Sequence, residues 1–465
     1  MEDAVRLISE KGIKILNLVH IPEDGRLKTL SFSALDEERI REVLNLGERV
    51  DGSSLFSFIE PGKSDIYIRP RVGKAFVNPF ASLPTLNVLC DYLGDDGEPL
   101  DVAPQTVLAK AEKKLCSSAG VTLNALAELE FYIVSKLDQE QAFPAAPDKN
   151  YHESTPFARF EHVRNEVVAT LAEVGIATKY AHGEVGRIVT EDGTLFEQHE
   201  VESAPRSLSD TADSVAIAKW VVRNVCARHG ASATFVPKIA LEHAGTGMHI
   251  HICGVRDGKN IMVGPDGKLS AETLQMIGGI LKFAPSLSAF GNPTPVSYLR
   301  FAARKESPMH ICWSARNRLA LIRIPLWWGY AKKEEEKGSG CRETFEYRAP
   351  DAFANPHLLL AGIAVAVGYG LANPSESSKI AENLHVEAGK IEQRKLEALP
   401  HSCHEAAENL ERDRRFYEAG GVFPKRLVDK TVEKLKAYRD KDLWKSLGNK
   451  PEEVGKLVKQ FLHHG

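Results

Sequence analysis

Three short stretches of the chain place ionisable side chains at alternate positions within otherwise apolar segments that favour β-strands. These pairs are Glu128 and Glu130 in "AELEFYIV", His249 and His251 in "MHIHI", and Glu346 and Arg348 in "TFEYR". Because successive side chains of a strand point to opposite faces, each pair projects from one face of its strand. A buried carboxylate is very costly unless a cation or a hydrogen-bond donor meets it. Three such strands therefore constrain the fold strongly, because they favour convergence on a shared cation site.

Any one of these strands, taken alone, is typical of the polar face of a half-exposed sheet. Together, their carboxylate oxygens and a minority of imidazole nitrogens suit Mg²⁺ or Mn²⁺ better than zinc or iron. Closely spaced divalent ions also clamp phosphoryl oxygens during phosphoryl transfer. The pattern thus predicts a metal site suited to phosphoryl chemistry.

The composition excludes several other classes of protein. The 465 residues are 43% hydrophobic and 26% charged, as in ordinary globular proteins, and the net charge of −4 gives no argument for nucleic-acid or membrane partners. No apolar run approaches the length of a membrane span, and the start "MEDAVRLISEKGIK" lacks a secretory apolar stretch. The seven cysteines are scattered without a CxxC pair, which suits reduced thiols. We therefore expect a cytoplasmic protein.

Patterning along the chain indicates two domains of α+β class. Strand-like runs alternate with one helical segment up to about Asp101, and a proline-initiated helix follows at residues 103–120. Beyond it, helical segments alternate with strands that carry acids or histidines, and "TEDGT" at 190–194 has the composition of a hairpin tip. We expect a large body built on an antiparallel sheet after the small first unit.

At this point the chain resembles a known family, the glutamine synthetases, and specifically the bacterial and archaeal type I enzymes. The order and spacing of the shared motifs make the resemblance specific, and it spans nearly the whole chain. The motifs are "DGSS" (51–54), "ELEFY" (128–132), "HGEVG" (182–186), "EQHE" (197–200), "FVPK" (235–238), "GTGMHIH" (245–251), "SYLR" (297–300), "ESP" (306–308), "ARNRLALIRIP" (315–325), "FEYRAPD" (345–351) and "GGVF" (420–423).

The resemblance implies a β-grasp-like N-terminal domain at residues 1–101 and a catalytic domain with a curved antiparallel sheet at 102–465. It implies that ATP drives ligation of ammonia to the γ-carboxylate of glutamate, through γ-glutamyl phosphate, to give glutamine. It also implies two Mg²⁺ or Mn²⁺ ions per active site, ATP as co-substrate, sites between neighbouring subunits, and a homo-dodecamer of two stacked hexameric rings.

The same resemblance assigns residues to the metals and to the nucleotide. Glu130, Glu184 and Glu200 would hold the ion nearer glutamate, and Glu128, His249 and Glu346 the ion nearer the ATP phosphates. His251 and Arg323 would contact the nucleotide phosphates, while Arg318 and Arg348 would stabilise charge on the transferring phosphoryl group.

Further residues match the binding sites for glutamate and ammonia. Arg300 would grip the α-carboxylate of glutamate, and the small residues from Gly245 to Gly247 would let substrate approach the backbone. Glu306 matches the flap glutamate, which closes the site and takes a proton from the tetrahedral adduct. Asp51, Ser54, Tyr151 and Glu184 match the ammonium pocket, in which Asp51 would accept the ammonium proton.

The chain departs from the family pattern at several positions. Glu184 and Glu200 stand sixteen positions apart (200 − 184), a longer gap than usual, so Glu197 and Glu202 remain rivals of Glu200 as ligand. Ala244 replaces the asparagine that normally touches substrate glutamate, and His385 replaces the tyrosine that is adenylylated in many relatives. In the nucleotide region, Cys253 replaces a serine, and Cys341 and Thr344 stand where a basic stretch is usual.

Two alternatives to ammonia ligation stay open. A γ-glutamyl-amine ligase would join glutamate to a polyamine, ethanolamine or an aromatic amine while keeping the metal ligands and Glu306. A catalytically lapsed homologue would serve a structural or regulatory role, but unused clustered carboxylates repel one another and destabilise a fold.

Overall fold

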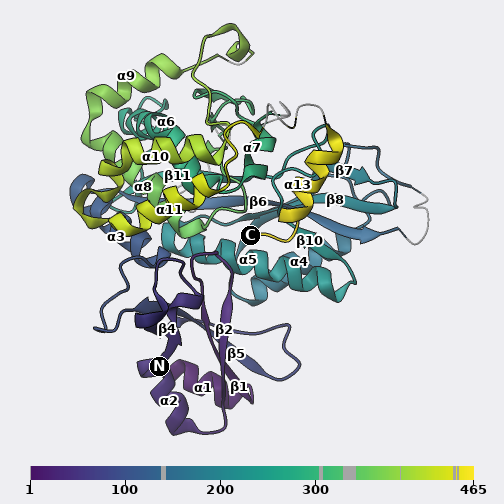
Figure 1. Cartoon of the computed structure of the whole chain (residues 1–465), viewed down its shortest axis with the longest axis vertical. Coiled ribbons are helices and arrows are strands. Elements are labelled where there is room, and N and C mark those ends of the chain that lie inside the picture. Colours follow the sequence, from purple (N-terminus) through teal and green to yellow (C-terminus); the bar gives the residue numbers. More distant parts are fainter. Residues whose placement is uncertain are drawn as a thin grey trace.

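Two β-sheets of unequal size organise the chain (Figure 1). The computed structural model describes residues 2–137, 143–302, 307–327, 342–387, 389–443, 447 and 450–465. The smaller sheet has the strand order β2-β1-β5-β4-β3, in which β1 and β5 run parallel and the other pairs antiparallel. Its elements are α1 (Glu2–Glu10), β1 (Ile15–His20), β2 (Lys28–Ser33), α2 (Glu37–Leu46), β3 (Glu48–Asp51), β4 (Asp65–Val77) and β5 (Thr85–Leu93).

The larger sheet has ten strands, with the main order β13-β14-β15-β11-β6-β8-β7. Its strands are β6 (Thr122–Lys136), β7 (Thr178–Val189), β8 (Thr194–Ser203), β9 (Arg206–Ser207), β10 (Ser232–Thr234), β11 (Met248–Arg256), β12 (Lys259–Asn260), β13 (Trp313–Ala315), β14 (Ile322–Ile324) and β15 (Phe345–Tyr347). All pairs except β13 with β14 are antiparallel, and β7 and β8 form the predicted hairpin. The expected α+β architecture is confirmed, while the domain boundary near residue 101 stays a prediction.

Helices cover one face of the large sheet and leave the other face to polar side chains. The described helices of this part of the chain are α3 (Pro104–Ala119), α4 (Glu161–Glu173), α5 (Leu208–Arg228), α6 (Ala271–Gly291), α7 (Pro295–Ala302), α8 (Pro356–Ala372), α9 (Pro374–Leu384), α10 (Cys403–Glu418), α11 (Lys425–Ala437) and α13 (Pro451–Phe461). Helices α3 and α5 pack against β6, and α4 packs against β7. Leu129, Phe131 and Ile133 of β6 join the main apolar core. Strand alternation therefore turns Glu128 and Glu130 to the opposite face.

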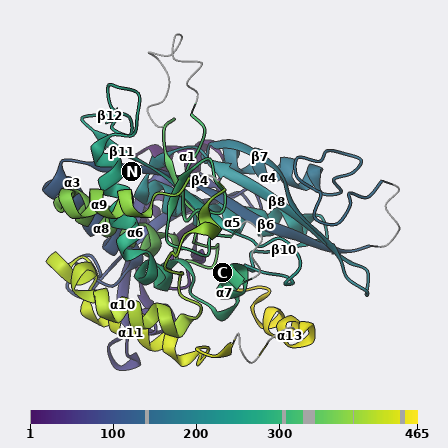
Figure 2. The same cartoon turned by 90° about the horizontal axis from the view of Figure 1, so that it is seen from above.

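The helices of the C-terminal half form a second layer around α8. Figure 2 shows α10 and α11 side by side beyond α6 and α8, on the side of the molecule away from β7 and β8. Among the described residues, no single helix is long and apolar enough to cross a membrane. The pair α8 and α9, which is bent by 109°, has the length and composition of a membrane span only when the two helices are taken together.

A buried ion-pair network joins the small N-terminal sheet to the helices that cover the large sheet. Arg71 of β4 donates two hydrogen bonds, of 2.8 and 3.1 Å, to the carboxylate of Asp213 on α5. His357, near the start of α8, lies 3.1 Å from the same carboxylate. Since breaking a buried pair by removing one partner is strongly destabilising, this network fixes how the two units dock.

The cysteines correct one expectation drawn from the sequence. Cys90, Cys116, Cys226, Cys312 and Cys403 are free thiols, as expected. Cys253 is disulfide-bonded, so the expectation of reduced thiols is wrong for this residue. Spacing could not foresee the bond, because cysteines distant in the sequence meet only after folding.

Helix α5 buries a lysine whose ionisation makes stability depend on pH. Lys219 Nζ donates to the Ala352 carbonyl at 2.9 Å, and burial, followed by the charge of Arg223, lowers the pKa of Lys219 to about 7. Between pH 7 and about 10.5 the unfolded chain holds a proton that the folded chain has lost, so stability rises with pH by up to ~1.4 kcal/mol per unit. We expect Lys219→Met to flatten this rise in thermal unfolding between pH 7 and 9.5. The exposed Lys113→Met is the control and should keep the wild-type slope. Equal slopes in wild type and Lys219→Met would contradict the assignment.

Candidate active site

The strand register of the large sheet lines up polar side chains in two rows on one face. In the first row, Tyr180 of β7 pairs with Glu202 of β8, Glu202 with Glu128 of β6, and Glu128 with His249 of β11. In the second row, His182 of β7 pairs with Glu200 of β8, and Glu200 with Glu130 of β6. On the far side of β11, His251 pairs with Glu346 of β15. Residues two positions apart share a face, so the alternation seen in the sequence becomes a continuous ionisable surface.

Glu128, His249 and Glu346 form one compact group of potential metal ligands, since one ligand atom of each lies within 4.8 Å of the others. His249 Nδ1 lies 2.8 Å from Glu128 Oε2 and 3.5 Å from Glu346 Oε1. Arg323 Nη1 donates to Glu346 Oε2 at 2.7 Å, and Arg348 Nη1 donates to Glu346 Oε1. Three strands far apart in the sequence therefore meet here, at a carboxylate already paired with two guanidinium groups.

Both carboxylates of this group are held in the ionised form. Burial would raise the pKa of Glu128, but the charge of His251 and hydrogen bonds from His249 and His251 outweigh it and hold that pKa well below its usual range. Burial also opposes ionisation of Glu346, yet the charge of Arg348 prevails and lowers its pKa to about 2. Metal ligands must be deprotonated, so both groups are ready to bind a cation.

A second compact group consists of His182, Glu184 and Glu200. His182 Nε2 lies 3.3 Å from Glu200 Oε1, and His182 Nδ1 lies 3.7 Å from Glu184 Oε2. His182 was not among the predicted ligands, although "HGEVG" places it two residues before Glu184. Glu130 lies beside this group: its Oε2 accepts from the Gly247 amide at 2.7 Å, and its Oε1 lies 3.7 Å from His249 Nε2.

Other carboxylates crowd Glu200, whose ion-pair partner among the described residues is the imidazole of His182. Burial and then the charges of Glu128, Glu130 and Glu184 raise the pKa of Glu200 well above its ordinary value. No lysine or arginine among the described residues forms an ion pair with it. Carboxylates crowded in this way repel one another unless a cation lies among them. The donor set therefore fits a divalent cation of the Mg²⁺ or Mn²⁺ type.

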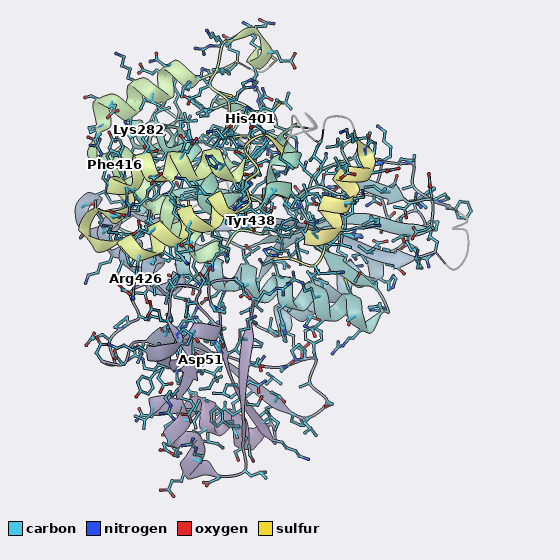
Figure 3. All side chains as sticks on the ribbon, in the orientation of Figure 1. Asp51, Lys282, His401, Phe416, Arg426 and Tyr438 are labelled. Carbon is cyan, nitrogen blue, oxygen red and sulfur yellow. The ribbon has the colours of Figure 1, made fainter. Side chains whose placement is uncertain are left out.

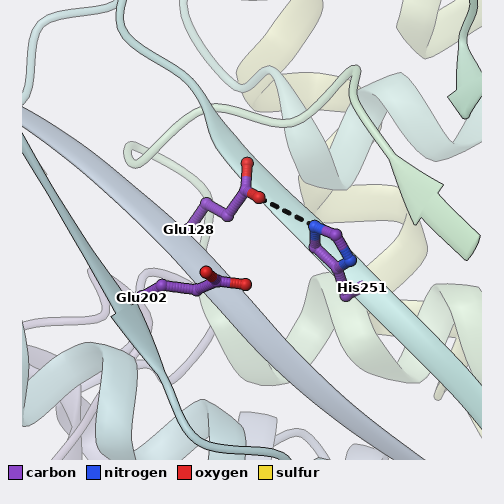
Figure 4. A group of neighbouring side chains, drawn as sticks. All are labelled: Glu128, Glu202 and His251. Atoms are coloured by element: carbon purple, nitrogen blue, oxygen red, sulfur yellow. Dashed lines mark hydrogen bonds and ion pairs between the residues drawn. The ribbon is translucent and has the colours of Figure 1, made fainter. Parts of the chain in front are cut away.

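The two rivals of Glu200 have different positions. Glu197 points to the other face, where it is fully buried and accepts from the backbone amides of Arg159 and Phe160 at 3.0 and 2.9 Å. Glu202 shares the face of Glu200, next to Glu128 and His251 (Figure 4). Geometry thus removes Glu197 from the cluster and leaves Glu202 within it.

The loop before β11, Gly245–Gly247, lacks bulky side chains because His249 and Arg300 pack directly against its backbone. A Cβ atom on Gly247 would lie 2.6 Å from His249 Nε2 and 2.8 Å from Arg300 Nη2. A Cβ atom on Gly245 would lie 2.9 Å from Arg300 Cγ. The loop therefore lets Arg300 and His249 approach the backbone, besides any contact that a substrate makes.

The four arginines predicted for substrate and phosphate lie around the same face. Arg300 is buried on α7 and donates to the carbonyls of Ala349, Pro350 and Arg348 at 2.8, 3.2 and 3.0 Å. Arg318 is exposed at the rim, whereas Arg323 and Arg348 pair with Glu346. Backbone carbonyls thus fix Arg300, and Glu346 orients two of the other guanidinium groups.

A cavity of about 610 Å³ opens over this face. The cavity is lined by eight of the predicted site residues: Glu130, Glu184, Glu200, Gly245, His249, Arg300, Arg318 and Arg348. Its lining also includes Ala244, Ser307, Asp148, Lys149 and Gln198. Asp148, Lys149 and Gln198 were not among the predicted site residues. Gln198 Nε2 donates to Glu130 Oε2 at 3.1 Å and to the Gly245 carbonyl at 2.8 Å. Its spacing of two residues from Glu200 was the available signal.

The structure does not bring every predicted site residue to this cavity. Asp51 and Ser54 are exposed on the N-terminal unit, and none of the described residues lining the cavity comes from that unit (Figure 3). Tyr151 is half exposed, stacks on His152 with ring centroids 4.2 Å apart, and lies edge-on to His182 at 5.3 Å. Glu306 and Cys341 lie outside the described residues.

Comparison with known proteins identifies the family. The family described as "Glutamine synthetase, catalytic domain" matches residues 101–442, and "Glutamine synthetase, beta-Grasp domain" matches residues 12–94. A glutamine synthetase from Thermotoga maritima is 32% identical, over 90% of this chain and 92% of that protein. One from Thermococcus kodakarensis is 33% identical, over 90% and 91%.

Solved structures share the fold at lower sequence identity. A Plasmodium falciparum glutamine synthetase superposes with a TM-score of 0.79 at 20% identity, covering 97% of this chain and 98% of that one. A GmaS/ADP complex superposes with a TM-score of 0.77 at 22% identity, covering 98% and 100%. With two family domains matched in order and relatives above 30% identity over nine-tenths of the chain, this protein belongs to the glutamine synthetase family and is an ATP-dependent ligase.

Proposed function

We propose that this ligase joins ammonia to the γ-carboxylate of glutamate through γ-glutamyl phosphate, producing glutamine, ADP and phosphate. The observation that supports it most directly is the convergence of Glu128, His249 and Glu346 beside a cavity that also contains Arg300. Relatives from Thermotoga maritima and Thermococcus kodakarensis bear the name glutamine synthetase.

Two metal ions complete the proposal. Glu130, Glu184 and Glu200 would hold one, with His182 as an added neighbour, and Glu128, His249 and Glu346 would hold the other. When bound, the ions would neutralise phosphoryl charge and orient the phosphate oxygens. Glu200, with its raised pKa, would have to lose its proton to bind, so metal binding should be weaker at low pH.

The remaining residues act by positioning substrates and stabilising charge. The γ-carboxylate oxygen of glutamate attacks the γ-phosphorus of ATP, and ADP departs. Ammonia then attacks the acyl carbon, and phosphate leaves as the amide forms. Arg300, which backbone carbonyls hold in place, would bind the α-carboxylate of glutamate. Arg318 and Arg348 would stabilise negative charge on the transferring phosphoryl group. Arg323 and His251 would contact the nucleotide phosphates, and Glu306 would close the site and take the adduct proton.

The carboxylate of Asp51 suits binding of ammonium better than removal of its proton. Hydrogen bonds from Ser53 and then Ser54 lower the pKa of Asp51 to about 2, so this exposed group is a weak base. We therefore propose that it attracts NH₄⁺ by charge, together with Ser54, Tyr151 and Glu184, and that proton release needs a further change in the assembled site.

Because Asp51 lies apart from its own chain's cavity, we propose that it completes the site of a neighbouring copy in a homo-dodecamer. Mixed assembly tests this. Asp51→Ala and Glu346→Gln chains should each be inactive, whereas oligomers reassembled from both should regain up to about a quarter of wild-type activity, since random pairing restores one site in four. Recovery should be absent when either variant is mixed with itself. Failure of every mixture would contradict the shared site.

The identity of the amine is tested by ADP release with Mg²⁺, glutamate and a panel of amines. Turnover with ammonium alone supports the proposal. Preference for ethanolamine, a polyamine or an aromatic amine would support the second candidate, a γ-glutamyl-amine ligase, which Ala244 favours because it leaves extra space at the cavity wall. No turnover by folded protein would favour a lapsed homologue.

A further inference from the structure

One buried amide, that of Gln198 on β8, is hydrogen-bonded to three segments that each carry a predicted site residue. Its Nε2 donates to Glu130 Oε2 at 3.1 Å and to the Gly245 carbonyl at 2.8 Å, and its Oε1 accepts from the Gly186 amide at 2.8 Å. Gln198 is fully buried and lines the cavity. A single side chain therefore connects β6, the loop before β11 and β7.

The contact with β7 falls where the ladder between β7 and β8 is interrupted. The register shifts between Gly183 and Arg187, and both Glu184 and Gly186 lie inside this irregularity. A Cβ atom on Gly186 would lie 2.5 Å from Gln198 Oε1, so a side chain here would collide with the amide. The Gln198 amide thus holds β7 in place along the stretch that carries Glu184.

The backbone at Gln198 is held as firmly as its side chain. Asn150, which is fully buried, donates from Nδ2 to the carbonyls of Gln198 and Glu184, at 3.0 and 3.1 Å. Because these bonds span both strands at the irregularity, β8 cannot shift at Gln198 without breaking them. The amide therefore has a fixed base from which to orient its partners.

The contact with Glu130 decides which of its two oxygens is available to a cation. Oε2 accepts from both Gln198 Nε2 and the Gly247 amide, at 3.1 and 2.7 Å, whereas Oε1 lies 3.7 Å from His249 Nε2. An oxygen that accepts two hydrogen bonds has both lone pairs engaged, so a cation would meet Oε1. The orientation of the amide is itself fixed by this network, because its nitrogen faces two acceptors and its oxygen faces a donor.

We propose that Gln198 is a positioning residue of the ligase. Its amide turns Glu130 Oε1 toward the metal and holds the Gly245–Gly247 loop and the Glu184 stretch at fixed distances from that oxygen. The inference rests on the proposed function, since it concerns the ion assigned there to Glu130, Glu184 and Glu200. Removing a group that orients a metal ligand typically costs about 10- to 100-fold in metal affinity or activity.

Mn²⁺ titration of the full-length, metal-stripped enzyme, followed by the electron paramagnetic resonance of free Mn²⁺, tests this role. Gln198→Met keeps the length of the side chain but removes its amide. It should weaken the ion at Glu130 at least ~10-fold and leave the other proposed ion unchanged. In steady-state kinetics the KM for glutamate should rise at least ~10-fold and the KM for ATP less than ~2-fold, because the loop that packs against Arg300 loosens.

Gln105→Met is the matched control. Gln105 is also buried, and its Nε2 donates to the Ile21 carbonyl at 2.7 Å, in a part of α3 away from the cavity. This variant should lose stability but keep both metal affinities and both KM values.

The outcomes separate this inference from the proposed function. Equal losses of metal affinity in the two variants, or no loss in Gln198→Met, would overturn the positioning role and leave the proposed function intact. Absence of Mn²⁺ binding in wild type would overturn both. Should Gln198→Met fail to assemble, Mn²⁺ anomalous scattering from wild-type crystals decides. A peak within about 2.5 Å of Glu130 Oε1 supports the inference, and a peak nearer to Oε2, or no peak, overturns it.

Discussion

Glu346→Gln is expected to lower kcat/KM for ADP release by at least ~10³-fold. The carboxylate of Glu346 is fully buried, pairs with Arg323 and Arg348, and lies 3.5 Å from His249 Nδ1. Its loss removes a metal ligand and leaves two guanidinium groups facing the metal position without a counter-charge. Both effects oppose binding of a cation at Glu128 and His249.

Mn²⁺ titration separates this effect from general damage. The ion at Glu346 should be lost, whereas the ion at Glu130, Glu184 and Glu200 should keep its affinity. Glu343→Gln is the matched control, because this residue lies on the same segment and its carboxylate accepts a hydrogen bond from Asn260, outside the site, at 3.5 Å. Unchanged metal binding in Glu346→Gln would show that the carboxylate only holds the arginines in place.

Gly247→Ala should lower activity by roughly 10²-fold or more without a comparable loss of stability. The added methyl would lie 2.6 Å from His249 Nε2 and 2.8 Å from Arg300 Nη2, and neither group can yield freely. His249 is held by Glu128 and Arg300 by backbone carbonyls. The substitution therefore displaces a proposed metal ligand and the proposed glutamate clamp together.

Alanine variants of two further glycines, Gly245 and Gly73, serve as controls with smaller expected effects. Gly245→Ala should be milder, because its methyl approaches Arg300 Cγ at 2.9 Å and has no contact with His249, and Gly73→Ala should be neutral, since its methyl meets nothing within 4 Å. Activity and Mn²⁺ affinity should decline in the order Gly73, Gly245, Gly247. Full activity in Gly247→Ala would mean that the loop accommodates a side chain and that the observed packing is not required.

The alternation of residue types and the order of the motifs predicted which side chains share a face of the sheet and where the β7–β8 hairpin lies. The pairing of apolar with ionisable positions on β6, β11 and β15 predicted which side chains share a face, and the sheet places them so. "TEDGT" predicted the hairpin between β7 and β8. Such features are local, because the pleat of a strand fixes side-chain direction within two residues.

Other features escaped the sequence because they depend on contacts between distant segments. The cavity's Asp148 and Lys149 stand in an irregular segment, where no periodicity marks a function. The burial of Lys219 could not be predicted from the sequence, because it depends on how α5 packs in the folded protein. The disulfide at Cys253 likewise needs a partner that folding brings near.

The sequence by itself determined the type of ligand that this site can hold, since carboxylates and imidazoles, together with Arg348, occupy the alternating positions. The tertiary structure alone decided how they are grouped. Strand register places Glu202 against Glu128 and turns Glu197 away, a distinction that one residue of slippage would reverse. Register is set by long-range pairing of β6 with β8 and β11, and no short stretch of sequence encodes it.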